Sequence, residues 1–144
     1  MIRQIDHIGI AVHKLEDHIP FYRDILGLSF LGIETVEDQK VRTAIFETGM
    51  VHIELLEPTS AESPIAKFLQ KRGEGLHHIA YRSDNLDRQL EHLKHSGIRL
   101  IDEHPRPGAH GSRIAFIHPK SSGNVLTELC ETSATKTQSQ SKIR

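Results

Sequence analysis

Two histidines and two glutamates are the residues of this chain whose types and positions suggest chemistry. His7 and His78 each begin an apolar stretch that is typical of a strand, and Glu54 and Glu128 each lie in a later stretch of the same kind. Alternate residues of a strand point to opposite faces, so the parity of a position tells which face it occupies. By that rule, each half of the chain offers one histidine from its first strand and one carboxylate from its last.

Two imidazoles and two carboxylates suit a borderline divalent ion, with further positions left open for water or substrate oxygens. A carboxylate on an apolar sheet face is costly unless it is paired or bound to a metal. The sequence therefore predicts one divalent ion per chain, Co, Zn, Mn or Ni, held by His7, Glu54, His78 and Glu128. We interpret Glu57 and Glu131 as surface charges at strand ends.

One order of elements, strand, helix and three strands, positions these residues and is used twice. In the first half the helix carries apolar residues at helical spacing from Leu15 to Leu26 and ends at Gly27, with Pro20 in its first turns. The strands of the first half are expected at 6–12, 28–36, 40–47 and 50–57.

The second half repeats this order, and aligning His78 with His7 also aligns Leu86 with Leu15. Its helix carries leucines at helical spacing and ends at Gly97. Its strands are expected at 76–83, near 98–102, and at 112–117 and 124–131.

These patterns predict an α+β fold in which two tandem βαβββ modules form an open, metal-centred half-barrel. A single domain is expected over residues 1–131, and Ser63 and Pro64 begin its linker helix as N-cap and first helical residue. The expected segments are module 1 at 4–58, the linker helix at 63–73, module 2 at 75–131 and a flexible tail at 132–144.

Composition excludes several classes of partner. The 18 Lys and Arg residues balance 19 Asp and Glu residues, and this net charge of -1 argues against nucleic acid. No apolar run approaches the roughly 20 residues that cross a bilayer. The single cysteine, Cys130, has no partner for an internal disulfide, and the first residues lack a signal-peptide pattern. We expect a protein of the cytoplasm that does not bind membranes.

Six segments carry a resemblance to a known family: DHIGIAV, FYRDILGL, ELLEPT, SPIAKFLQKRGEGLHHIA, PRPGAHG and HPKSSGNVLTELCE. Over about residues 4–131 the chain resembles the vicinal oxygen chelate (glyoxalase/bleomycin resistance/dioxygenase) superfamily and, within it, the methylmalonyl-CoA epimerase family. The resemblance implies a homodimer and metal ligands at His7, His78 and Glu128, with Glu54 at the fourth ligand position. Some epimerases carry Gln at the position of Glu54 and a catalytic Glu at the position of Thr43.

The implied activity is metal-dependent epimerisation of methylmalonyl-CoA, an acyl-CoA, by proton transfer at the carbon next to the thioester. We predict that Glu128 or Glu54 doubles as metal ligand and proton shuttle, with Glu47 as a spare candidate. Weaker candidates for substrate binding are His110 in PRPGAHG and the pair Lys120 and Ser121 in HPKSSG.

Two other functions remain open at this point. A glyoxalase-type lyase also shuttles a proton beside a carbonyl, and turnover of glutathione hemithioacetal distinguishes it from an epimerase. A metal-free protein that binds small molecules such as drugs is the alternative outside enzymes, and metal content after purification without chelators distinguishes it.

Overall fold

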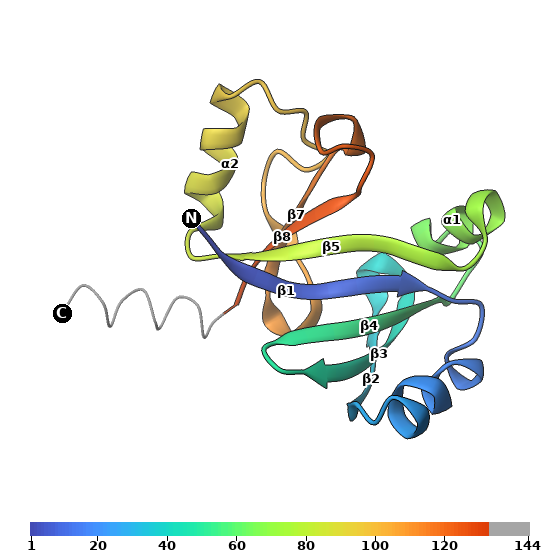
Figure 1. Ribbon diagram of the computed structural model, residues 1–144. Coiled ribbons are helices and arrows are strands. Elements are labelled where there is room, and N and C mark those ends of the chain that lie inside the picture. Colours follow the sequence, from blue (N-terminus) through green and yellow to red (C-terminus); the bar gives the residue numbers. More distant parts are fainter. Residues whose placement is uncertain (133–144) are drawn as a thin grey trace. The chain divides into compact units, whose positions relative to one another are not determined.

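The structure is a computed structural model, and it describes residues 1–132 of the 144-residue chain. The chain divides into two compact units (Figure 1). We call residues 7–77 the N-terminal unit, and residues 1–6 together with the residues from 78 onward the C-terminal unit. The expected modules differ from these units because the first strand contributes its first residues to the C-terminal unit.

The N-terminal unit is a four-stranded sheet in the order β2-β3-β4-β1. β3 pairs antiparallel with both β2 and β4, and β1 lies parallel to β4. All four expected strands are confirmed: β1 at Ile2–Ala11, β2 at Ser29–Val36, β3 at Val41–Thr48 and β4 at Val51–Pro58. One face of this sheet carries the apolar core that includes Leu15, Phe46 and Leu55.

The helix expected between β1 and β2 is not continuous. It consists of a 3-10 turn at Leu15–Asp17 and, after His18, two α-helical residues, Ile19 and Pro20, that lead into a π-helical turn at Phe21–Ile25. Pro20 stands directly before the second turn, and because it has no N–H it cannot continue the hydrogen-bond ladder from the first. Gly27 ends the segment in the left-handed conformation, with a φ of 74°, which glycine adopts without steric cost because it has no side chain.

The linker helix is confirmed as α1, Pro64–Arg72. The Ser63 hydroxyl oxygen accepts a hydrogen bond from the N–H of Ile65, and Pro64 occupies the first turn, where a missing N–H costs nothing. Ile65 and Leu69 pack on Leu56 in a second core of the N-terminal unit.

The C-terminal unit has its strands in the order β1-β5-β8-β7-β6. β5 is parallel to β8, whereas β7 is antiparallel to both β8 and β6. Leu86 and Leu90 of its helix pack against Leu129 of the sheet. The elements are β5 at Gly75–Ser83, α2 at Leu86–His95, β6 at Arg106–Pro107, β7 at Arg113–Ile117 and β8 at Thr127–Glu131.

Two strand predictions in this unit were wrong in extent. The segment 98–102 forms a single bridge between Leu100 and Ile117, because the Asp102 carboxylate accepts the N–H of Phe116 at 2.8 Å in place of a backbone carbonyl. The last strand begins at Thr127 rather than at 124, since Asn124 is left-handed with a φ of 67°. No helix among the described residues is long and apolar enough to span a membrane.

The interpretation of Glu57 as a surface charge was wrong. This partly buried carboxylate accepts the N–H of Leu15 at 3.1 Å, at the start of the first 3-10 turn. It also accepts a hydrogen bond from Arg42, which reaches Glu16 at 3.4 Å. Glu57 thus satisfies a backbone donor at the start of this turn, where no carbonyl is available.

The same network recurs in the C-terminal unit. Glu131, only 4% exposed, accepts the N–H of Leu86 at 2.6 Å at the start of α2. Arg113 lies 3.8 Å from Glu131 and donates to Asp87 at 2.9 Å. Each of these residues corresponds in order to one of the first network, so the duplication extends from element order to individual hydrogen bonds.

Replacing Glu131 with alanine is expected to destabilise the fold by about 1.5–3 kcal/mol, because it leaves a buried N–H at the start of α2 without its charged acceptor. Urea denaturation measures the loss as a lower midpoint at constant slope. The exposed Glu103→Ala is the matched control and should change the free energy of unfolding by less than about 0.5 kcal/mol. Equal midpoints for the two variants would contradict the structural role of Glu131.

Candidate active site

His7 and Glu54 form a pair within the N-terminal unit. β1 and β4 run parallel with Gly9 opposite Glu54, which places His7 and Glu54 on neighbouring strands. The Nδ1 atom of His7 lies 3.0 Å from the Oε2 atom of Glu54, and Glu54 is only 9% exposed. Gly9 adds no side chain on that face.

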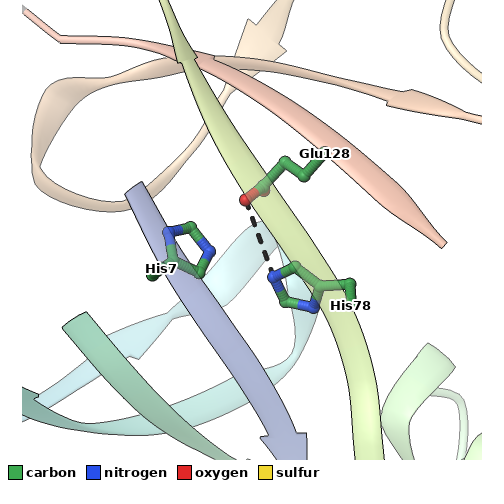
Figure 2. A group of neighbouring side chains, drawn as sticks. All are labelled: His7, His78 and Glu128. Atoms are coloured by element: carbon green, nitrogen blue, oxygen red, sulfur yellow. Dashed lines mark ion pairs between the residues drawn. The ribbon is translucent and has the colours of Figure 1, made fainter. Parts of the chain in front are cut away.

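His78 and Glu128 form the corresponding pair within the C-terminal unit. They extend from β5 and β8, and Figure 2 shows the two side chains facing each other, with His7 on β1 also labelled. The Nε2 atom of His78 lies 3.6 Å from the Oε2 atom of Glu128, and each residue is 5% exposed. The ring of Phe116 stands edge-on to the His78 ring, with centroids 5.9 Å apart.

The donor atoms of each pair suit a divalent ion. With bonds of about 2.0–2.1 Å, two neighbouring ligand atoms of one ion lie about 3–3.4 Å apart. The separations of 3.0 and 3.6 Å within the two pairs are close to this spacing. Each pair also provides a buried carboxylate beside an imidazole, which is the combination that a cation stabilises.

A carboxylate that the sequence interpretation missed, Glu34, lies on the same face of the N-terminal sheet as Glu54. In the antiparallel ladders Glu34 is opposite Thr43, and Thr43 is opposite Leu56, which shares the parity of Glu54. Thr43 is 2% exposed, so this part of the face is enclosed. Residues along β2 alternate between exposed and partly buried, and this alternation places Glu34 among the partly buried ones. Glu47 is exposed at the end of β3.

The weaker substrate candidates lie in two turns of the C-terminal unit. His110 is exposed and left-handed, with a φ of 54°, and Lys120 is also exposed. The Ser121 hydroxyl oxygen accepts the N–H of Arg99 at 2.9 Å, which gives it a part in fixing the turn. Nearby, desolvation lowers the pKa of His118, and the charges of Arg99 and Lys120 add to this effect.

Comparison with known proteins defines the class. The family model of the Glyoxalase/Bleomycin resistance protein/Dioxygenase superfamily matches residues 6–116, and the chain belongs to this superfamily. It is 51% identical to the uncharacterized protein YqjC of Bacillus subtilis over 90% of this chain and 93% of that protein. It is also 39% identical to the mitochondrial methylmalonyl-CoA epimerase of Homo sapiens, over 88% of this chain and 72% of that protein.

A solved structure gives the same result for the fold. A methylmalonyl-CoA epimerase in complex with methylmalonyl-CoA and NH4+ has a TM-score of 0.87 and 40% identity to this chain. The similarity covers 94% of this chain and 98% of that one. The predicted α+β fold of two βαβββ modules and the resemblance to the epimerase family are therefore confirmed.

Proposed function

We propose that the protein epimerises methylmalonyl-CoA by moving a proton at carbon 2, which lies between the thioester and the free carboxylate. The observation that carries this proposal is the pair of a histidine and a buried glutamate found at corresponding places in both units. The relatives that support it are named methylmalonyl-CoA epimerases, one of them a solved structure with the same fold. This activity belongs to the isomerases.

We propose that His7, Glu54, His78 and Glu128 bind one divalent ion per chain, Co, Zn, Mn or Ni. The spacing of the donor atoms within each pair supports this set. When bound, the ion would act as a Lewis acid toward the charge that develops on the thioester oxygen after carbon 2 loses its proton. The Irving–Williams order leaves the choice among these ions to supply as well as to the ligands.

The carboxylates of Glu54 and Glu128 would move the proton. Inversion at carbon 2 requires that a proton leave from one side of the carbon and return to the other, so two groups act as base and acid in turn. Glu54 and Glu128 are both buried, and each comes from a different unit. Thr43 has no group that transfers a proton in this way, so a base at that position is not available to this chain.

The direct test is entry of solvent deuterium at carbon 2 of methylmalonyl-CoA in heavy water. We expect exchange by the purified protein, a loss of at least about tenfold after treatment with a chelator, and recovery when Co²⁺ or Zn²⁺ is added back. Exchange that the chelator does not change would show that the activity needs no metal ion. Turnover of glutathione hemithioacetal in place of methylmalonyl-CoA would move the assignment to a lyase.

We further propose that residues 1–131 act as one domain, that the protein is a homodimer and that it works in the cytoplasm. The resemblance to the epimerase family supports the dimer. Cys130 is buried and forms no disulfide, which is compatible with a reducing compartment. The proposed flexible tail, 132–144, lies almost wholly outside the described residues.

A further inference from the structure

The ring of Phe116 lies between Arg106 of β6 and His78 of the His78 and Glu128 pair in the C-terminal unit. Its guanidinium carbon is 5.3 Å from the centroid of the Phe116 ring. The ring of His78 also contacts that ring, at 5.9 Å between centroids and an interplanar angle of 80°. A positive charge is therefore held on the same face of the sheet as the pair proposed to bind the ion.

Asp102 forms an ion pair with this guanidinium. Its Oδ1 atom lies 3.3 Å from the Nε atom of Arg106, and its Oδ2 atom accepts the N–H of Phe116 at 2.8 Å. One carboxylate thus ties the arginine to the strand that carries the ring. The ion pair is closest at Nε and forms no hydrogen bond there, so it leaves the two terminal nitrogen atoms as the fork that binds carboxylates.

The backbone after Arg106 is also held in place. A Cβ atom at Gly108 would lie 2.6 Å from Cγ2 of Ile114 and 2.8 Å from the hydroxyl oxygen of Ser112, so only glycine fits there without a shift. The N–H of Gly108 donates to the carbonyl of Ser112 at 2.9 Å, which closes the loop. Arg106 itself is opposite Ile114 in the ladder of β6 and β7. Its position is therefore set by the sheet.

We propose that Arg106 binds the free carboxylate of a malonyl-type acyl thioester and thereby selects this class of substrate. The inference rests on the proposed function, because it concerns the group that such a substrate carries beside the reacting carbon. Removal of the proton from carbon 2 puts negative charge next to that carboxylate. A guanidinium held there offsets the repulsion and fixes the orientation of the acyl group. A ring-stacked arginine with a free fork suits a planar carboxylate better than a lysine would.

Isothermal titration with two CoA thioesters tests this assignment. Malonyl-CoA carries the carboxylate, whereas acetyl-CoA carries the same CoA phosphates without it. For Arg106→Gln we expect binding of malonyl-CoA to weaken about 10–100-fold and binding of acetyl-CoA to change by less than about twofold. Arg88→Gln, which removes an exposed arginine of α2, is the matched control and should change neither.

Equal weakening for both thioesters would overturn the proposal in favour of a contact with the CoA phosphates. No weakening for either would leave Arg106 with only its packing on Phe116. If Arg106→Gln does not fold, Arg106→Lys is tested in its place, because it keeps the charge but loses the planar fork. This variant should still bind malonyl-CoA more weakly than the wild type does, with acetyl-CoA affected less. Equal effects of this variant on the two thioesters would again overturn the proposal.

Failure of the proposed function gives a different result. A wild-type protein that shows no deuterium exchange but binds malonyl-CoA through Arg106 would refute the epimerase and keep the carboxylate site. Normal exchange together with no discrimination by the Arg106 variants would refute the carboxylate site alone.

Discussion

Replacing Glu128 with glutamine is expected to lower the rate of deuterium entry at carbon 2 by about 10²–10⁴-fold, the usual contribution of a general acid or base. Glutamine keeps the shape of the side chain and one oxygen that can face a metal, but it cannot take up a proton. Glu128 is 5% exposed and lies 3.6 Å from His78. A group from the solvent therefore cannot easily take over its role in proton transfer.

Glu54→Gln separates ligand binding from proton transfer. Some epimerases carry glutamine at this position, so we expect the variant to retain its metal. If Glu54 is one of the two proton-transfer groups, exchange should still fall by a similar factor. The metal content of each variant is measured beside its exchange rate, and the exposed Glu103→Gln serves as the control that should change neither.

Full activity in both glutamine variants would eliminate the assignment of Glu54 and Glu128 as proton shuttles. Glu34 would then be the next carboxylate to examine, because it lies opposite Thr43 on the same face of the N-terminal sheet. Loss of activity together with loss of metal would instead show that the carboxylate is needed to bind the ion.

The sequence predicted the strands of the N-terminal unit well because β-branched residues alternate there with polar or small ones, as at Ile8, Gly9 and Ile10. It predicted the first helix poorly. Apolar spacing from Leu15 to Leu26 is helical, yet Pro20 interrupts the backbone hydrogen bonds, and spacing does not report on a missing N–H. In the segment 98–102 a side chain, Asp102, took the place of a backbone acceptor, which no periodicity reveals.

Strand parity, together with the repeat, also selected one histidine and one carboxylate of each half as candidates, because the period of two in a strand leaves little choice once the apolar face is known. It did not predict the roles of Glu57, Glu131 and Arg106. Charged residues at strand ends and in Pro-rich segments resemble solvated ones in sequence. Their partners here, such as the N–H of Leu86 or the ring of Phe116, are brought together only by the tertiary fold.

Replacing either His7 or His78 with alanine is expected to remove the metal ion and to lower exchange by about 10²–10³-fold, as loss of the charge stabilisation at the thioester oxygen would. The equality of the two variants is the important result. If one ion takes ligands from both units, wild-type protein binds one ion per chain, and each variant binds none tightly. If each pair holds its own ion, wild-type protein binds two, and each variant retains one.

Metal analysis of the purified protein and titration of the chelated protein with Co²⁺ distinguish these cases without reference to activity. His92→Ala, on the exposed face of α2, is the matched control and should leave one ion per chain. Two ions in the wild type would contradict the shared site and leave each unit with a site of only two protein ligands. Two protein ligands are fewer than the three or four that hold catalytic metals in proteins. Duplication of the module alone would then not produce the catalyst. One ion with equal loss in both variants would mean that duplication gave the protein two half-sites that work only as one.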